Sequence, residues 1–171
     1  MSKNYIKPTS FSGAQGHTSQ NASLAYQISS HPSYAYEESQ YGRKANAQLL
    51  AVVIGKSNNI QTNTLRLMLG LLNAGQTFQL TCIIKSGPHS DGNAFDAVIL
   101  NNKEHGFYDN KVPEWQDFID VIDSIVVGWD GQLKLGLPNL GYESSTPNVS
   151  RFLDTPKTTG ATGIHLHVWF G

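Results

Sequence analysis

The C-terminal residues 163–171 (GIHLHVWFG) carry the feature that most constrains the fold, a strict alternation of side-chain type. Successive side chains of an extended strand point to opposite faces of its sheet. One face would carry only apolar groups, from Ile164, Leu166, Val168 and Phe170. The other face would carry His165, His167 and Trp169. The segment therefore predicts a strand that is buried on one side and presents two imidazoles and an indole on the other.

The composition is typical of a β-rich protein with a neutral polar surface. Charged residues make up 15% of the 171 residues, well below the roughly 25% that is usual in globular proteins. Asn, Gln, Ser, Thr and Gly are abundant instead. The net charge of −1 excludes a strong overall attraction to nucleic acid or to an anionic membrane, although a locally basic part can still bind a charged partner.

Charge and polarity divide the chain near residue 44. Residues 1–44 carry four Lys or Arg against two Glu, a net charge of +2, whereas the remainder has a net charge of −3. Residues 1–44 contain several tyrosines but no sustained repeat of apolar residues of the kind that a helix or strand shows. We therefore expect a flexible, locally basic N-terminal arm. Residues 45–171 are expected to form one β-rich globular domain, long enough to bury a core.

Apolar runs in the first half of the domain predict strands over residues 48–55, 65–72, 77–85 and 94–100. The second and third of these alternate on either side of a short polar loop, which indicates a β-hairpin. The alternative for residues 65–72 is a helix that begins at Asn63 and ends at Gly75, because Leu and Met favour helices.

One short helix is expected at about residues 113–123. Pro113 suits the first helical position. Apolar side chains then recur with the spacing of one helix face, at Trp115, Phe118, Ile119 and Ile122. The face expected to meet water carries Gln116, Asp117, Asp120 and Asp123.

Asp130-Gly131 is the strongest turn signal and predicts a hairpin between strands over 125–129 and 132–137. Trp129 would then be exposed at the hairpin tip. All these elements together predict an all-β or β-dominated α+β fold, a single small barrel or sandwich. An oligonucleotide-binding (OB) type of barrel is favoured, because it also places a helix between its third and fourth strands.

The histidine pair His165 and His167 could share a metal ion if a third ligand came from a loop residue such as His89, Asp91 or His105. The segment His165-Leu166-His167 also resembles the His-hydrophobic-His strand of the rolling-circle replication initiators and relaxases, the HUH nucleases, over three residues of 171.

That resemblance implies a divalent ion that activates a DNA phosphate for attack by a tyrosine, with Tyr26, Tyr34 or Tyr36 as the nucleophile. Two solvent-facing sheet histidines explain the same pattern without a metal. We therefore predict no catalytic residue, metal or cofactor, and keep His165 and His167 as the only metal candidates.

A second group combines aromatic rings with cations, at Tyr34, Tyr36, Tyr41, Arg43 and Lys44. Proteins that bind single-stranded nucleic acid stack bases on such rings and follow the backbone with cations. In the alternative interpretation, the tyrosines pack the arm onto the domain or onto a neighbouring subunit.

The sequence favours a non-enzymatic binding module, with single-stranded nucleic-acid binding of phage or plasmid type as the leading hypothesis. The candidate ligand-binding residues are Tyr34, Tyr36, Tyr41, Arg43, Lys44, Trp129, His165, His167 and Trp169. The alternatives are a virion-like, oligomeric structural or assembly protein, a protein inhibitor, a carbohydrate-binding module and a metal-dependent nuclease of the HUH kind.

The cysteine content, the N-terminal residues and the lengths of the apolar runs together indicate where the protein is expected in the cell. The single cysteine, Cys82, excludes an internal disulfide and lies in an apolar phase, so we expect it to be buried. No signal peptide opens the sequence, and no apolar run approaches the roughly 18 to 20 residues that a membrane helix needs. A cytoplasmic protein, or a virion component, is expected, without a membrane partner and with homo-oligomers possible.

Overall fold

The structure is a computed structural model that describes residues 18–36, 40–57, 59–84, 91–99, 113–129, 132–137, 144–153 and 166–170. The helices within these residues are α1 (Thr18–Ser29), α2 (Gln40–Val53), α3 (Thr62–Asn73) and α4 (Pro113–Val126). The strands are β1 (Phe78–Cys82), β2 (Ala94–Ile99), β3 (Leu133–Leu137), β4 (Val149–Leu153) and β5 (Leu166–Phe170). The fold is therefore mixed α/β with an open sheet, and the prediction of a β-dominated barrel or sandwich is wrong.

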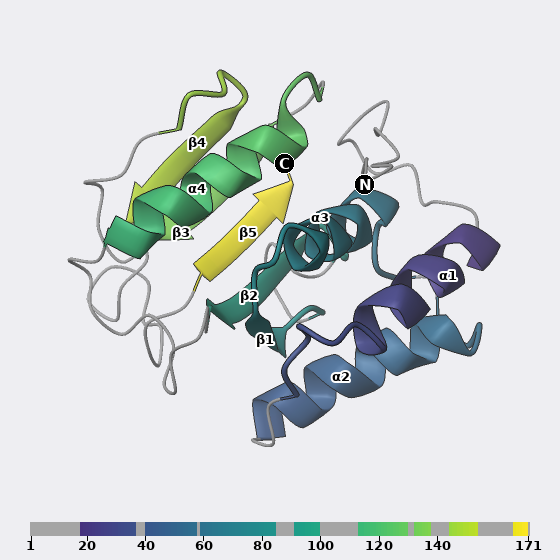
Figure 1. Ribbon diagram of the computed structural model, residues 1–171. Helices are drawn as coiled ribbons and strands as arrows, with labels where there is room; N and C mark the ends of the chain where they lie inside the picture. The colour runs from purple at the N-terminus through teal and green to yellow at the C-terminus, as the bar shows by residue number, and fades with distance from the viewer. Residues whose placement is uncertain are drawn as a thin grey trace.

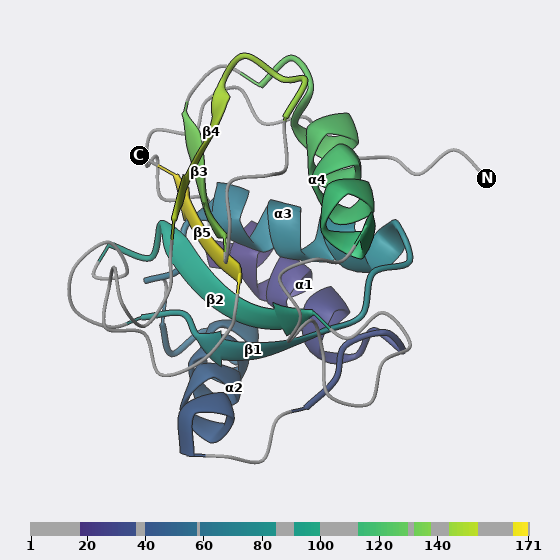
Figure 2. The ribbon, with the colours of Figure 1, turned by 90° about the vertical axis from the view of Figure 1, so that its left-hand side faces the viewer.

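The five strands form one sheet in the order β1-β2-β5-β3-β4 (Figure 1). All neighbouring strands are antiparallel except β3 and β4, which are parallel. Helices α3 and α4 lie over the same face of the sheet, while α1 contacts α3 and α2 contacts β1 (Figure 2). The opposite face of the sheet has none of these helices on it.

The last strand of the sequence, β5, lies at the centre of the sheet and confirms the predicted alternation. Leu166, Val168 and Phe170 are buried in the core on the helix side. Val168 pairs with Phe95 of β2 and Leu135 of β3, which are buried on the same side. This row of apolar side chains across three strands fixes which face of the sheet meets the helices.

The strand predicted over residues 48–55 is wrong, because α2 runs to Val53. Its inner face buries Gly42, Ala45, Leu49 and Val52. Leu50 and Ile54 are apolar too, but 44% and 64% exposed. Because aliphatic side chains lie on both sides of the helix, the sequence shows an unbroken apolar run and the helical period is lost.

The hairpin predicted over residues 65–72 is also wrong, because this segment lies in α3. The helix packs over the sheet and contacts α1 and α4 as well (Figure 1), so nearly its whole circumference is buried. A helix buried on every side loses the apolar stripe that distinguishes it from a strand. The high helix propensity of its leucines and methionine then decides the outcome. The second half of the predicted hairpin is confirmed as β1, which pairs with β2.

The helix predicted at residues 113–123 is confirmed as α4, which continues to Val126. Ile125 and Val126, which the sequence assigned to a strand, are buried on its inner face. The chain then turns at Gly128, where φ is +76°. Strand β3 therefore has no partner in the preceding segment and pairs with β4 and β5 instead.

Part of the predicted N-terminal arm forms regular structure. Leu24, Ala25 and Ile28 of α1 are buried in the hydrophobic core. The fully buried Asn21 donates from its side chain to the Ile60 carbonyl at 3.1 Å and accepts from the Thr62 hydroxyl at 2.8 Å. Residues 1–17 of the arm lie outside the described residues.

Gly92 joins the loop before β2 to the N-terminal end of α3. Its carbonyl accepts from the Gln61 backbone N–H at 3.1 Å and from the Thr64 hydroxyl at 2.8 Å. Its φ is +71°, and a Cβ built there would lie 1.8 Å from the Asn59 carbonyl oxygen. Both the conformation and the close approach require glycine.

We predict that Gly92→Ala lowers the free energy of unfolding by about 3 kcal/mol, because backbone strain and a steric overlap add up. Gly75→Ala is the matched control, since Gly75 also has a positive φ (+90°) but nothing within 4 Å of its Cβ position. It should cost only about 1 kcal/mol. Urea unfolding of both variants measures the difference, and equal losses would contradict the role of the Asn59 contact.

Candidate functional site

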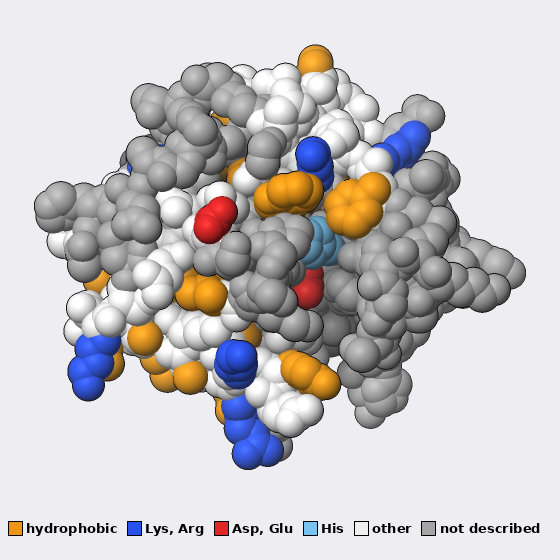
Figure 3. Space-filling model, turned by 180° about the vertical axis from the view of Figure 1, so that it is seen from behind, with side chains coloured by type: hydrophobic (Ala, Val, Ile, Leu, Met, Phe, Trp, Pro, Cys, Tyr) orange, Lys and Arg blue, Asp and Glu red, His pale blue; other side chains and the backbone are white. Residues whose placement is uncertain are grey.

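The face of the sheet opposite the helices carries two rows of paired residues across β2, β5 and β3. In the first row His167 of β5 lies between Asp96 and Gly136. In the second row Trp169 lies between Ala94 and Lys134. Figure 3 views the molecule from this side and shows a histidine beside hydrophobic side chains, with an acidic and a basic group close by. We call this surface the open face.

The two residues His167 and Asp96 form a direct pair. The imidazole Nδ1 lies 2.7 Å from the Asp96 Oδ1, a short distance that is typical of a charge-assisted hydrogen bond. Only 7% of His167 is exposed. When Nδ1–H donates to the carboxylate, Nε2 of the neutral ring is an acceptor. The pair thus fixes both the orientation and the tautomer of a buried imidazole.

Aromatic rings flank this pair. The ring of Phe152, from β4, meets the His167 ring edge to face at 5.7 Å between centroids. Trp169 is half-buried, and the Lys134 ammonium lies 4.4 Å from the centroid of its ring, within the range of a cation–π interaction. The open face therefore combines flat apolar surfaces, one cation and an oriented hydrogen-bonding ring.

The sequence predicted two of these residues. His167 and Trp169 lie on the face opposite Leu166, Val168 and Phe170, as the alternation requires. His165 lies outside the described residues.

Three other members of the open face, Asp96, Lys134 and Phe152, were not predicted. Asp96 and Lys134 each interrupt an apolar run at the alternate position (AFDAVI and LKLGL), which signals a polar face of a strand. The sequence does not show which strands are neighbours. It therefore could not predict that Asp96 and Phe152 contact His167, or that Lys134 contacts Trp169.

Trp129 is not at the surface. It is 6% exposed, and its ring stacks on Phe170 at 6.3 Å between centroids, on the helix side of β5. The prediction of an exposed hairpin tip is wrong because the preceding residues are helical. The turn signal Asp130-Gly131 lies outside the described residues.

The tyrosine-rich segment does not form one platform. Tyr34 packs edge to face on Phe78 at 6.4 Å, and its hydroxyl lies 3.2 Å from the Asn46 side-chain oxygen. Tyr36 and Tyr41 are 47% and 54% exposed. The remaining predicted residues, Arg43 and Lys44, are exposed on α2. Since α2 contacts β1, this group lies at one end of the sheet rather than in the rows of the open face.

Tyr34 gives the protein a specific alkaline sensitivity. Burial, and secondarily the neighbouring Tyr36, raise the pKa of its phenol from 10.0 to about 12. Between these two values the unfolded chain loses a proton that the folded protein keeps. The contribution to stability is therefore complete below pH 10 and is lost as the pH rises toward 12.

We predict that the stability of the wild type falls by about 2 kcal/mol more than that of Tyr34→Phe between pH 9.5 and pH 12. At pH 7 the variant should lose about 1 kcal/mol, because the hydrogen bond to Asn46 is missing. Urea unfolding across this pH range measures both effects, and parallel pH profiles would contradict the burial of the phenol.

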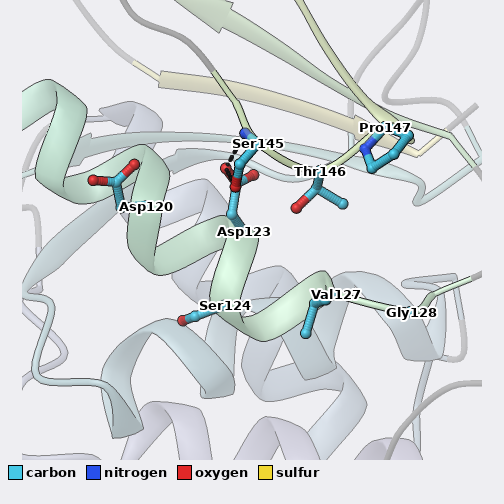
Figure 4. A pocket seen from close by; sticks show the side chains of 8 residues that line it. All are labelled: Asp120, Asp123, Ser124, Val127, Gly128, Ser145, Thr146 and Pro147. Atoms are coloured by element: carbon cyan, nitrogen blue, oxygen red, sulfur yellow. Dashed lines mark hydrogen bonds between the residues drawn. The ribbon is translucent and has the colours of Figure 1, made fainter.

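A separate pocket of about 400 Å³ lies where α4 ends beside the segment that leads into β4 (Figure 4). It is lined by Asp120, Asp123, Ser124, Val127, Gly128, Ser145, Thr146 and Pro147. Asp123 was expected to face water, but it is 5% exposed. Its carboxylate accepts from the Ser144 hydroxyl at 2.5 Å and from the Ser145 backbone N–H at 2.7 Å. Asp123 thus fixes this segment against the helix.

The described part of the chain contains no group of three His, Cys, Asp or Glu side chains that could hold a metal ion. Cys82 was expected to be buried, but it is only half-buried, at the β1 position that pairs with Asp96. None of the helices described here is long and apolar enough to cross a membrane.

Comparison of the chain with protein-family models, with curated proteins and with solved structures gave no match. Any function is therefore inferred from the geometry and chemistry of the sites themselves.

We predict that Asp96→Ala lowers the free energy of unfolding by about 2 kcal/mol, because it leaves the buried Nδ1 of His167 without its carboxylate. In the background of His167→Phe the same change should cost clearly less, since no donor is then left unsatisfied. Asp117→Ala, on the exposed side of α4, is the control and should be nearly neutral. Additive effects of the Asp96 and His167 changes would show that the pair contributes no coupling.

Proposed function

We propose that the protein is a non-enzymatic binding module whose open face takes single-stranded nucleic acid. The observation that carries the proposal is the contact between Lys134 and the ring of Trp169, next to Phe152 and His167 on one sheet face. Aromatic rings give bases a stacking surface, and a cation beside them matches the phosphate backbone.

The contact between Lys134 and Trp169 suggests how binding proceeds. In the free protein the ammonium lies over the indole. A base that stacks on Trp169 would displace the ammonium, which then pairs with a phosphate next to that base.

The distribution of charge among the described residues supports an anionic ligand on this side. Lys134 lies on the open face, and Arg43 and Lys44 are exposed on α2. Figure 3 shows basic side chains in the middle, at the upper right and along the lower edge of this view, with acidic side chains near its middle. The exposed carboxylates Asp117 and Asp120 lie on α4, which covers the other face of the sheet.

The ammonium of Lys134 favours nucleic acid over a neutral sugar as the ligand of the open face. Carbohydrate-binding sites also use tryptophan rings, but a neutral sugar offers Lys134 no counter-charge once the ammonium is displaced from the ring. With about three cations near the strand, the logarithm of the affinity should fall with the logarithm of salt concentration with a slope of about −2.

We predict that a fluorescein-labelled twenty-residue oligo(dT) binds in a polarisation titration, more weakly at 150 mM than at 50 mM salt. Trp169→Ala should weaken this binding by about 5- to 150-fold, because one stacking contact is worth about 1–3 kcal/mol. Lys134→Gln should reduce the slope of the salt dependence.

Tyr26→Ala is the matched control, since Tyr26 is 60% exposed on α1 and away from the open face. Binding that is insensitive to salt, or an equal loss in the Trp169 and Tyr26 variants, would refute the proposal. A response to neutral oligosaccharides on a glycan array, without one to the oligonucleotide, would favour a carbohydrate-binding module instead.

A further inference from the structure

The two edges of the sheet are not equivalent. At β1 the Ala35 backbone N–H donates to the Phe78 carbonyl at 3.1 Å, next to an isolated bridge between Tyr34 and Phe78. Just beyond β1, the side-chain amide of Gln48 in α2 donates to the Ile84 carbonyl and accepts from the Ile84 N–H. The β1 edge is therefore paired with other parts of the chain.

The opposite edge, β4, pairs only with β3 within the described residues. The Leu133 N–H donates to the Asn148 carbonyl at 2.9 Å. Because backbone groups of a strand alternate in direction, Ser150 and Phe152 face β3, whereas Arg151 directs its N–H and carbonyl outward. Leu153 directs its N–H outward as well. These outward groups form the row that an added strand needs.

The side chain of Arg151 adds a charge to this edge. Its partner in register, Leu135, is buried on the helix side of the sheet, so Arg151 points to that side too. Arg151 is exposed, and no ion pair links it to another described residue. A strand that pairs with β4 would place one of its own side chains directly opposite this guanidinium, where a carboxylate is favourable.

The pocket at the end of α4 lies on the same side, where the chain enters β4 (Figure 4). Its residues Ser145, Thr146 and Pro147 come just before the turn that leads into β4 at Val149, so a partner strand that continues past Val149 reaches the pocket. Its lining includes the exposed Asp120, and the last carbonyl groups of α4 add partial negative charge. The pocket therefore favours a cationic side chain.

We propose that the β4 edge and this pocket together bind an extended segment of a partner protein, which adds to the sheet as an antiparallel sixth strand. The segment carries an acidic residue opposite Arg151 and, four residues later, a Lys or Arg whose side chain enters the pocket. Main-chain hydrogen bonds supply affinity, and the two charged positions supply specificity.

A second copy of this chain fits the edge less well. When two β4 strands pair antiparallel about a two-fold axis at their central residue, Arg151 lies opposite its own counterpart. Like charges in direct opposition are destabilising. The charge at the centre of the edge thus selects an acidic partner over self-association.

The test uses the full chain and two labelled ten-residue peptides, TVTETVTKTV and TVTKTVTKTV, which differ only in the charge placed opposite Arg151. The first peptide should bind in a polarisation titration. Arg151→Glu should weaken its binding about tenfold and reverse the preference between the two peptides. Arg151→Pro removes the outward N–H but none of the bonds to β3, and should abolish binding of both peptides.

Amide hydrogen exchange distinguishes strand addition from any other mode of binding. The first peptide should slow exchange at Arg151 and Leu153 at least tenfold, whereas Ser150 and Phe152 are already bonded to β3 and should change little. Slow amide exchange at Ser150 and Phe152 in the Arg151→Pro variant would also show that this variant is folded. Lys56→Glu, exposed just after α2, is the control and should bind like the wild type.

The proposal is overturned if neither peptide binds at 1 mM, or if Arg151→Pro binds as well as the wild type. It is also overturned if size-exclusion chromatography shows a dimer that Arg151→Pro dissociates, because the occupant is then a second copy. Oligonucleotide binding uses side chains of the open face and not the outward backbone groups of β4 or the side chain of Arg151, so either proposal can fail without the other.

Discussion

The nearly complete burial of α3 is the constraint on which the rest of the structure depends. Its leucines fill the space between the sheet, α1 and α4, so the positions of three other elements follow from this helix. The polar residues at its N-terminal end would be costly to bury alone. The side chain of Asn21 and the carbonyl of Gly92 supply their partners, which ties α1 and the start of β2 to the same helix.

This arrangement places the helices on one face of the sheet and makes the other face chemically different. On the helix side the central strand is purely aliphatic and aromatic. On the open face it carries an imidazole held by a carboxylate and an indole in contact with an ammonium. The second of these pairs leaves a half-buried ring and an ammonium for recognition.

The sequence predicts those elements whose two sides carry different types of side chain, apolar on one side and polar or mixed on the other. β5 and α4 are of this kind, and their periods of two and 3.6 are visible. Helices α2 and α3 lack that contrast, because Leu50 and Ile54 are apolar but exposed and α3 is buried all round. The fold class was missed for this reason. Two of the five side chains described on the open face, His167 and Trp169, followed from alternation. Asp96 lies 71 positions from His167 in sequence, and only the strand order brings it into view.

The Ala35 N–H occupies the β1 edge at Phe78, and the amide of Gln48 imitates a peptide group at Ile84 just beyond it, which limits what the sheet can build. A sheet with two unpaired edge strands can polymerise, since each molecule that adds to one edge brings another unpaired edge. Because the β1 edge is already bonded to other parts of the same chain, growth by strand pairing would stop after one partner has added to β4. Any complex formed in this way has a fixed one-to-one stoichiometry and no route to a fibre.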